Sequence, residues 1–334
     1  MARNRNSQRP YLLVVAAGGY ATRALVLTGY GAKPKAFVNA GVGGATVLEE
    51  ITREANRSGI DECVVITSSD RVSEVFARFY DPLGLDPSFD EYLQRRQRTD
   101  ELDLVASRPT FRRVHFVIQS EPRGFGDAIA LAEPYLRAGT ENGDPFAGAV
   151  VALGDDVVHA ETPAIRQLIS AHRLTGDMIV GVQRVTKEQA RGFGVVVVDP
   201  NPLALSEEFC GRTAYRVVGM EEKPSDPTPN QVDGEEVYLA VVGRYLVNLA
   251  DMAFLSKRTG TVEQELDFTA LQQQTANAGR LIAIELTGTW HTVGSSFGAQ
   301  KAFMHYALVP ETGDPTAEQE ELRRWVRGLL ETVD

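Results

Sequence analysis

Short apolar runs alternate with segments of helical spacing through the first half of the chain. The runs are rich in Val, Ile and Leu and have the length of buried strands: residues 11–17, 62–67, 114–119 and 147–153. Between them, apolar residues recur three and four positions apart, which predicts helices over residues 47–58, 71–80 and 127–137. Alternating helices and almost continuously apolar strands predict a parallel sheet that helices cover on both faces.

The pattern changes after residue 156, where shorter strands and polar loops are mixed. Strands are predicted over residues 178–184, 194–199, 215–220, 237–246 and 281–286. Polar loops are predicted at residues 201–212 and 224–236, and a helix at residues 295–308. Together with the first half, this predicts an α/β fold.

Two charged segments interrupt or follow this rhythm. Residues 81–113, with Arg95, Arg96 and Arg98, predict an inserted helix and loop that is either a solvated face or an oligomer contact. The tail, residues 316–332, predicts an acidic amphipathic helix whose apolar side includes Trp325. That side would pack on the body or on a second subunit.

The overall composition describes an ordinary globular protein. The 334 residues include 34 Lys and Arg against 45 Asp and Glu, a net charge of −11, with 43% apolar residues. An acidic chain lacks the basic face of a general nucleic-acid binder. No apolar run approaches the roughly 20 residues of a membrane span, and no apolar signal core follows the N-terminal arginines, which predicts a cytoplasmic protein. Cys63 and Cys210 form neither a disulfide framework nor a zinc spacing.

The loop that follows the first strand carries candidate phosphate-binding groups. Ala17, Gly18 and Gly19 offer backbone N–H groups that can approach a ligand, and Arg23 offers a planar donor fork suited to phosphate oxygens. Lys35 adds a second cation in the same long loop. The alternative is a tight turn without a ligand.

A second loop with candidate binding residues joins a strand to the start of a helix. Gly124 and Gly126 allow a close approach, and Asp127 follows them at the helix start. Gln119 can present a donor and an acceptor to the edge of a base, either O4 and N3–H of uracil or O6 and N1–H of guanine. Size alone favours uracil, the smaller of the two bases, and therefore UTP over GTP.

Two further strand ends carry charged pairs. Asp155 and Asp156 suit Mg²⁺, which takes one or two protein carboxylates together with phosphate oxygens; a turn or helix cap is the alternative. Asp156 is expected to matter less than Asp155, because adjacent strand residues point to opposite faces. Glu222 and Lys223 place an acceptor for hydroxyls beside a cation for a phosphate.

Taken in order, these motifs resemble those of the sugar-1-phosphate nucleotidylyltransferases. The resemblance is greatest to the bacterial UTP–glucose-1-phosphate uridylyltransferases and runs from residue 11 to about residue 308. The matching segments are residues 18–23, 34–35, Gln119 with 124–128, 153–156, 193–195, 222–224, 242–245 and 291–294.

The resemblance implies a Rossmann-like nucleotidylyltransferase fold with a mostly parallel mixed sheet and a small sugar-side subregion. Residues 1–10 would form a flexible arm, residues 11–156 the nucleotide-binding half, residues 157–308 the sugar-binding half and residues 309–334 a C-terminal amphipathic helix. The implied reaction joins a nucleoside triphosphate to a sugar 1-phosphate, with Mg²⁺ as cofactor and release of pyrophosphate. A homodimer or homotetramer is implied, with no nucleic-acid or membrane partner.

The resemblance also implies a role for each matching residue. The catalytic residues would be Arg23, Lys35, Asp155 and Lys223, with Asp155 and Asp267 as metal ligands. The nucleotide would contact Ala17, Gly18, Gly19, Gln119, Gly124, Gly126 and Asp127. The sugar would contact Asp156, Gly194, Glu222, Lys223, Val242 and Gly243.

Departures from the family pattern leave three hypotheses. The first is uridylyl transfer to glucose 1-phosphate. The second is the same chemistry with GTP, ATP or dTTP and a sugar-like acceptor such as a cyclitol phosphate. The third is a non-catalytic homologue that binds a nucleotide or sugar. It is motivated by Ala21 in place of a glycine, and by Thr269 and Thr292 in place of aspartates, which leaves Asp267 as a nearby substitute.

Overall fold

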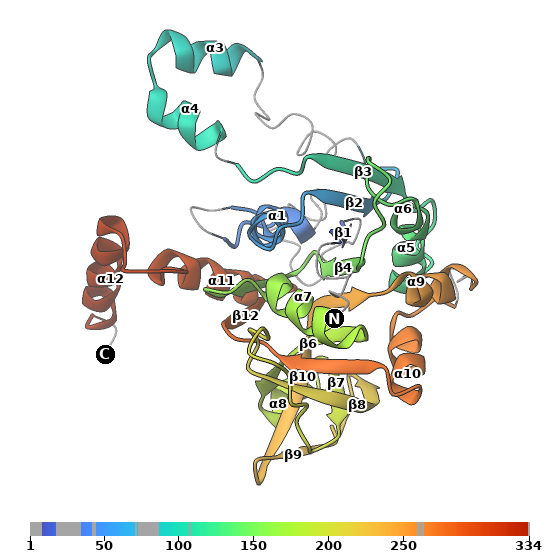
Figure 1. The fold of residues 1–334 in the computed structure, drawn as a ribbon. Coiled ribbons are helices and arrows are strands. Elements are labelled where there is room, and N and C mark those ends of the chain that lie inside the picture. The colour runs from blue at the N-terminus through green and yellow to red at the C-terminus, as the bar shows by residue number, and fades with distance from the viewer. Residues whose placement is uncertain are drawn as a thin grey trace.

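The computed structural model describes residues 9–17, 35–41, 45–70, 72, 87–106, 108–258, 261 and 264–332 (Figure 1). The strands are β1 (Tyr11–Ala16), β2 (Glu62–Thr67), β3 (Arg113–Ile118), β4 (Gly148–Leu153), β5 (Asp156–His159), β6 (Met178–Val185), β7 (Gly194–Val198), β8 (Thr213–Glu222), β9 (Asn230–Val232), β10 (Glu235–Val247), β11 (Leu281–Glu285) and β12 (Thr289–Thr292). The α-helices are α1 (Val47–Arg57), α3 (Pro87–Arg95), α4 (Thr99–Ala106), α5 (Phe125–Ala130), α6 (Glu133–Ala138), α7 (Ala164–Thr175), α8 (Lys187–Ala190), α9 (Leu249–Ser256), α10 (Thr269–Asn277), α11 (Ser296–Leu308) and α12 (Ala317–Leu330).

Within these residues, ten strands form one mixed sheet in the order β3-β2-β1-β4-β10-β6-β11-β8-β7, with β9 paired to β10. The strands β1 to β4 pair in parallel, as their apolar sequences predicted. The long strand β10 then runs antiparallel to both β4 and β6 and joins the two halves of the sheet. Antiparallel pairing of β7 with β8 and of β8 with β11 completes the second half. The predicted α/β fold with a mixed sheet is confirmed.

Helices cover both faces of the sheet. Successive residues of β1 point to opposite sides, so Leu13 belongs to the same part of the core as Ile51 of α1, while Leu12 belongs to the part that contains Ile129 of α5. The helices α1, α7 and α11 lie over one face, and α5, α6, α9 and α10 lie over the other (Figure 1). This double cover explains why the central strands are buried along almost their whole length.

Two of the predicted helices are not confirmed as single elements. The single helix predicted over residues 127–137 is wrong, because α5 ends at Ala130 and α6 begins at Glu133. Proline in the first turn of α6 has no N–H and cannot continue a preceding helix. The helix predicted over residues 71–80 lies outside the described residues, apart from the helical residue 72.

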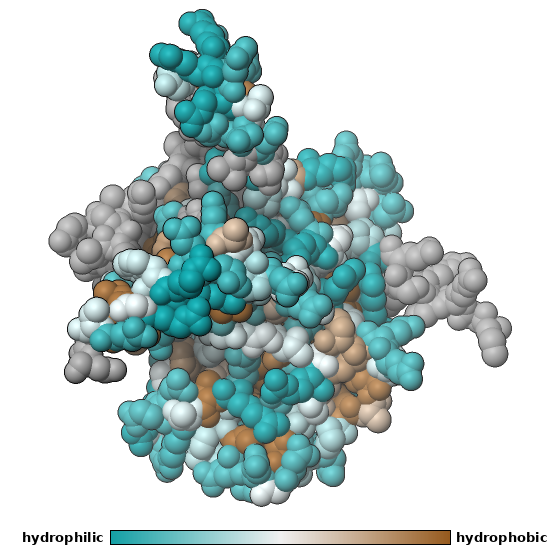
Figure 2. All heavy atoms as spheres, turned by 90° about the vertical axis from the view of Figure 1, so that its left-hand side faces the viewer, coloured by the Kyte–Doolittle hydropathy of each residue, from teal (hydrophilic) through white to brown (hydrophobic). Residues whose placement is uncertain are grey.

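The charged insertion is the pair of helices α3 and α4, which extends away from the body (Figure 1). Its visible surface is hydrophilic (Figure 2). Exposed ion pairs, such as Arg95 with Glu91 and Arg98 with Glu101, lie on this projection. These features favour the solvated-face interpretation of the insertion.

The predicted C-terminal helices are confirmed as α11 and α12. Along α12, Leu322 and Val326 are half-buried, whereas Trp325 is 62% exposed and Leu330 is 60% exposed. Among the residues described, no helix combines the length and apolar character needed to cross a bilayer.

Candidate active site

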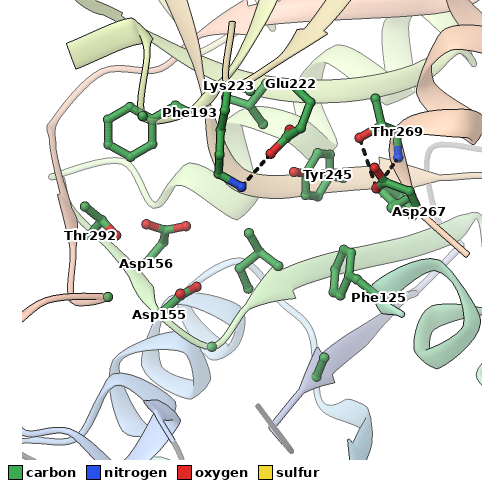
Figure 3. A pocket seen from close by; sticks show the side chains of 18 of the residues that line it. Phe125, Asp155, Asp156, Phe193, Glu222, Lys223, Tyr245, Asp267, Thr269 and Thr292 are labelled. Atoms are coloured by element: carbon green, nitrogen blue, oxygen red, sulfur yellow. Dashed lines mark hydrogen bonds and ion pairs between the residues drawn. The ribbon is translucent and has the colours of Figure 1, made fainter. Parts of the chain in front are cut away.

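A cavity of about 830 Å³ lies where β4 ends, between that edge of the parallel sheet and strands β8 and β10. Ligands of α/β sheets bind outside the carboxyl ends of the strands. In Figure 3 the side chains of Asp155 and Asp156 lie on one side of this cavity, facing the Lys223 ammonium. Asp267 and Phe125 lie toward its other end. The structure thus brings together predicted residues from five separate parts of the chain: Ala17, Asp155, Asp156, Gly194, Glu222, Lys223 and Asp267.

The two adjacent aspartates occupy a turn rather than a continuous strand. β4 ends at Leu153, Asp155 lies in the turn, and β5 begins at Asp156. The Val293 N–H donates to the Asp155 carbonyl at 2.7 Å and fixes the turn. The expectation that the two side chains point to opposite faces is therefore wrong, because both line the cavity.

Asp156 is a buried carboxyl beside a second carboxyl. Burial raises its pKa to about 7, and the negative charge of Asp155 adds to the effect. The Trp290 indole N–H donates to Asp156 Oδ1 at 2.8 Å and works in the opposite direction. A Cβ on Gly243 would lie 2.5 Å from Asp156 Oδ2, so glycine makes room for this carboxyl.

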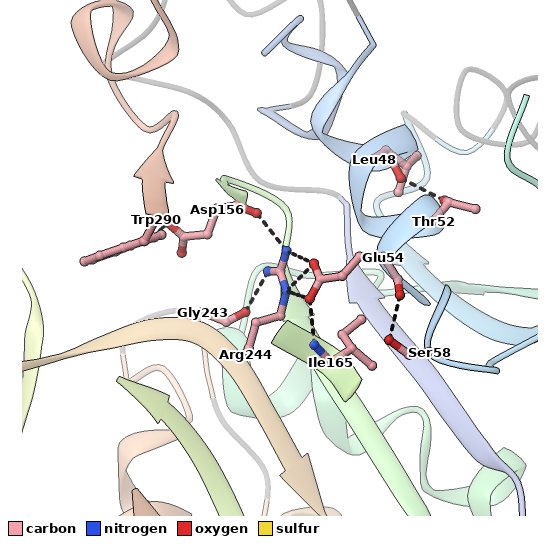
Figure 4. Close-up of polar contacts among 9 residues, drawn as sticks. All are labelled: Leu48, Thr52, Glu54, Ser58, Asp156, Ile165, Gly243, Arg244 and Trp290. Atoms are coloured by element: carbon pink, nitrogen blue, oxygen red, sulfur yellow. Dashed lines mark hydrogen bonds and ion pairs between the residues drawn. The ribbon is translucent and has the colours of Figure 1, made fainter. Parts of the chain in front are cut away.

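A buried ion pair supports the turn from below (Figure 4). Arg244 on β10 is 0% exposed and pairs with Glu54 of α1 at 2.8 Å. The same guanidinium donates to the Asp156 carbonyl at 3.0 Å and to the Gly243 carbonyl at 3.1 Å. The pair thus ties α1, β10 and the start of β5 together directly behind the aspartates.

Lys223 stands at the end of β8 with an unusual backbone conformation. Its φ of 44° lies in the left-handed region, which is costly for a residue with a Cβ and tends to occur at functional sites. Its N–H donates to the Phe193 carbonyl at 3.1 Å, and its Nζ pairs with Glu222 at 2.7 Å. Both side chains line the cavity.

The second glycine loop packs against another chain segment. A Cβ on Gly124 or Gly126 would lie 2.7 Å from the Leu266 carbonyl oxygen, and Gly124 has a φ of 100°. The Gly126 N–H donates to that oxygen at 2.8 Å. These glycines therefore admit residues 265–267 and bring Asp267 to the cavity, where its carboxylate accepts hydrogen bonds from the Thr269 N–H and hydroxyl.

The Gln119 side chain forms hydrogen bonds with this loop. Its amide Nε2 donates to Asp127 Oδ2 at 2.9 Å and to the Gly124 carbonyl at 3.2 Å. Asp127 is buried and also pairs with Arg123 at 3.3 Å. Neither Gln119 nor Asp127 lines the cavity formed by the described residues. The predicted contact of Gln119 with a base stays a prediction.

Other predicted residues are placed elsewhere or not described. Val242 is completely buried in the core behind the site. Gly18, Gly19 and Arg23 lie outside the described residues, as does the Lys35 side chain, although residues 35–37 form a short 3₁₀ helix. The neighbouring Ala36 lines the cavity.

Comparisons with known proteins identify the family of the chain. A family model described as nucleotidyl transferase matches residues 12–307. The chain belongs to the nucleotidyl transferase family. The family predicted from the motifs is thus confirmed.

Individual relatives of this nucleotidyl transferase cover nearly the whole chain. The UTP--glucose-1-phosphate uridylyltransferase of Bacillus subtilis is 29% identical over 297 residues, which cover 88% of this chain and 90% of that protein. A second such enzyme, from Staphylococcus saprophyticus, is 29% identical and covers 90% of this chain and 92% of its own. A UTP-bound UGPase structure from Acinetobacter baumannii has a TM-score of 0.72 at 22% identity, covering 95% of this chain and 98% of its own. This structural likeness shows a shared fold.

Carboxylates dominate the charge of the nucleotidyl transferase cavity. Among the described lining residues the carboxylates are Asp155, Asp156, Glu222, Glu265 and Asp267, and the ammonium is that of Lys223. No cluster of three His, Cys, Asp or Glu side chains poised to hold a metal occurs within the described residues. The carboxylates of Asp155 and Asp267 lie toward different ends of the cavity, and each offers the oxygen donors that Mg²⁺ takes together with substrate phosphates and water.

Aromatic side chains form part of the cavity wall, and the sequence did not predict this. Phe193 and Trp290 pack with ring centroids 4.7 Å apart, and Phe268 packs against Phe125 at 5.4 Å and Tyr245 at 4.9 Å. Trp290 lies on β12, a strand of four residues that pairs with β5. A strand of four residues is too short to show an alternation of apolar and polar residues. The sequence therefore indicated this part of the wall only through Trp290 itself, next to His291.

Three histidines of the nucleotidyl transferase, on β5, β12 and α11, lie close together. The His305 ring of α11 lies 4.7 Å from that of His159 and 4.8 Å from that of His291. Burial lowers the pKa of His291 to about 4, and the charges of His305, His159 and Lys301 act in the same direction. The pKa values of His159 and His305 are lowered chiefly by burial, with Arg57 also acting on His159.

This cluster predicts a loss of stability in mild acid. An unfolded histidine titrates near 6.5, so below that pH the unfolded chain binds a proton that folded His291 refuses until about pH 4. The contribution of His291 to the free energy of unfolding should be complete above about pH 6.5 and should fall by on the order of 2 kcal/mol as the pH is lowered to 4, whereas Asp156, whose pKa is raised to about 7, acts in the opposite direction over this range. Urea titrations across this range measure it, and His291→Gln should weaken the dependence. Equal slopes for the two proteins would contradict the assignment.

Proposed function

We propose that this chain transfers a uridylyl group from UTP to glucose 1-phosphate, forming UDP-glucose and pyrophosphate. The observation that carries the proposal is the arrangement of Asp155, Asp267 and the Glu222–Lys223 pair around one cavity at the ends of the parallel strands. The names of the relatives from Bacillus subtilis and Staphylococcus saprophyticus support UTP and glucose 1-phosphate as the substrates.

The chemistry needs positioning and charge neutralisation more than proton transfer. A phosphate monoester has a second pKa near 6, so the attacking phosphate arrives already ionised at pH 7. Lys223 binds that phosphate and orients it toward the nucleotide, while Glu222 and the Gly194 backbone receive the sugar hydroxyls. The attacking oxygen bonds to the α-phosphorus as the bond to pyrophosphate breaks.

The leaving pyrophosphate carries the charge that must be stabilised. We assign Arg23 and Lys35 to the triphosphate on the basis of the motif, and the backbone of Ala17 and Gly18 with Gln119 to the base. Asp155 and Asp267 would hold Mg²⁺, which when bound neutralises phosphate oxygens. A cavity whose described walls are mostly anionic needs these cations to admit a triphosphate.

A substrate panel tests the proposal. Pyrophosphate release is measured with UTP, dTTP, GTP, ATP and CTP, each paired with several sugar 1-phosphates and a cyclitol phosphate. The highest kcat/KM is expected for UTP with glucose 1-phosphate. A tenfold preference for GTP or ATP would replace the uridylyl assignment by the same chemistry with another base. Absence of turnover with every pair would favour a non-catalytic binding protein.

Lys223→Ala is expected to raise the KM for the sugar 1-phosphate by about 10- to 100-fold, with less effect on the KM for UTP. The reason is the loss of a charged hydrogen bond to the attacking phosphate. Lys187→Ala is a matched control, because this lysine pairs with exposed Asp226 and does not line the cavity. Equal increases in both KM values would show that Lys223 does not belong to the acceptor side.

Cytoplasmic location and a homo-oligomeric state stay predictions from the sequence. Size-exclusion chromatography with light scattering measures the second of these directly.

A further inference from the structure

The C-terminal helix α12 carries an apolar stripe that the rest of the described chain does not cover. The members of this stripe recur three and four positions apart: Leu322, Trp325, Val326, Leu329 and Leu330. Within the described residues no member is more than half-buried, and Trp325, Leu329 and Leu330 are 62%, 47% and 60% exposed. In Figure 1, α12 lies beyond the outer end of α11, away from the sheet. Exposed apolar surface of this kind marks an interaction site.

The chain presents this stripe on a well-formed helix. The Thr316 hydroxyl accepts from the Gln319 N–H at 3.2 Å, and the Gln319 side chain accepts from the Thr316 N–H at 3.1 Å, so α12 begins at a capping box. The Arg323 Nε donates to the Leu308 carbonyl at 2.7 Å and fixes α12 to the end of α11. A helix of 14 residues is nevertheless only marginally stable unless its apolar face packs on another surface.

The charges along α12 identify that surface. The charged residues of the first half are all acidic and those of the second half are all basic: Glu318, Glu320 and Glu321, then Arg323, Arg324 and Arg327. A membrane or a nucleic acid presents one sign of charge and would repel one of the two halves. A second copy of α12 that runs antiparallel presents the opposite sign to each half. The same order of charges suits the dipole of an isolated helix, but it leaves the stripe uncovered.

The register of an antiparallel pair also fits. A two-fold axis at the middle of Ala317–Leu330 places Leu322 of one copy level with Trp325 of the other. The same axis places Glu320 level with Arg327, and these two residues, seven positions apart, lie on one side of the helix. Because the axis is two-fold, each of these matches occurs twice in the pair.

We propose that α12 pairs antiparallel with α12 of a second copy of this chain, stripe against stripe, and forms the interface of a two-fold symmetric dimer. The ion pair inside one helix, Arg324 with Glu320 at 3.9 Å, is exposed and therefore weak, so these charges are available to the second copy. The proposal does not depend on the reaction that the cavity catalyses, since the stripe does not line that cavity.

Substitutions in the stripe test the interface. Light scattering across a dilution series of the full chain should give twice the 36.5-kDa mass of one chain, and the single mass on sufficient dilution. Trp325→Gln together with Leu329→Gln should raise the Kd of the dimer at least about tenfold, because the apolar contact is lost. Tyr92→Gln is the matched control, since Tyr92 is an aromatic residue, 51% exposed, on the projecting helix α3. This control should leave the Kd unchanged.

Disulfide cross-linking tests the antiparallel arrangement. The same axis places Glu318 of one copy level with Leu329 of the other, and both residues lie on the side of the stripe. Glu318→Cys chains and Leu329→Cys chains, each with Cys210→Ser, are oxidised with copper–phenanthroline, separately and mixed. The mixture should form a cross-linked pair and neither chain alone should do so, while Cys63 is buried away from the reagent.

Each outcome decides the proposal. A wild type that is monomeric at every concentration would overturn it, and binding of that monomer to phosphatidylglycerol vesicles would assign the stripe to a membrane. An unchanged Kd in Trp325→Gln with Leu329→Gln would place the dimer interface elsewhere. Cross-linking of Glu318→Cys with itself would show parallel helices and contradict the arrangement. If the doubly substituted chain loses helix content by circular dichroism, the disulfide pattern decides.

Discussion

Asp155→Asn is expected to lower kcat by about two to three orders of magnitude while leaving the fold intact. The substitution keeps the size and shape of the side chain but removes the charge that faces the substrate phosphates. The turn itself is held through the Asp155 carbonyl, which accepts the Val293 N–H at 2.7 Å and is unaffected by the change. The loss should therefore appear in pyrophosphate release at saturating substrates and not in the unfolding transition.

A magnesium titration makes this test specific. If Asp155 holds the cation, Asp155→Asn should need a higher Mg²⁺ concentration for half-maximal rate, whereas Asp103→Asn, on the exposed face of α4, should behave as the wild type. A rate near that of the wild type for Asp155→Asn at saturating Mg²⁺ would remove this residue from the mechanism. Asp156→Asn is the informative neighbour, because its side chain also lines the cavity and can still accept the Trp290 hydrogen bond.

The sequence could predict what depends on local pattern. Five apolar residues in a row, as in residues 11–15, specify a buried strand whatever lies beside it, and β1 is buried along those residues. The position of Asp155 could also be predicted, because the carboxyl ends of parallel strands meet at one edge of the sheet. Glu222 and Lys223 line the same cavity although about seventy residues separate them from Asp155 and β8 runs antiparallel to its neighbours, so the rule for parallel strands does not explain their position.

What could not be predicted depends on contacts between distant segments. Gly124 and Gly126 were interpreted as room for a ligand, but their space is filled by the backbone of Leu266. Gly243 was interpreted as a sugar contact, but its missing Cβ accommodates Asp156. A glycine requirement can be read from a sequence, whereas the atom that occupies the space cannot.

Arg244→Met is expected to lower the free energy of unfolding by about 3–5 kcal/mol. Arg244 is fully buried, and its removal leaves the Glu54 carboxylate, 8% exposed, without its counterion. A buried carboxylate without a partner must either stay charged at a high desolvation cost or take up a proton. The Asp156 carbonyl loses a donor at the same time. Urea-induced unfolding followed by circular dichroism measures the change.

Replacing both partners separates the ion pair from simple packing. In Arg244→Met with Glu54→Leu, neither charge of the pair is left, so about 2 kcal/mol of the loss should return. Recovery should be incomplete, since Glu54 also accepts the Ile165 N–H at 2.8 Å and the Asp156 carbonyl still lacks its donor. If the double variant is no more stable than Arg244→Met, the loss comes from packing around β10 rather than from an isolated carboxylate. The kcat of the double variant then reports on the turn that carries the aspartates. Because Arg244 donates to the Asp156 carbonyl, a stable double variant should still have a lower kcat than the wild type. A wild-type kcat would show that β12 and the Val293 hydrogen bond position the aspartates without Arg244.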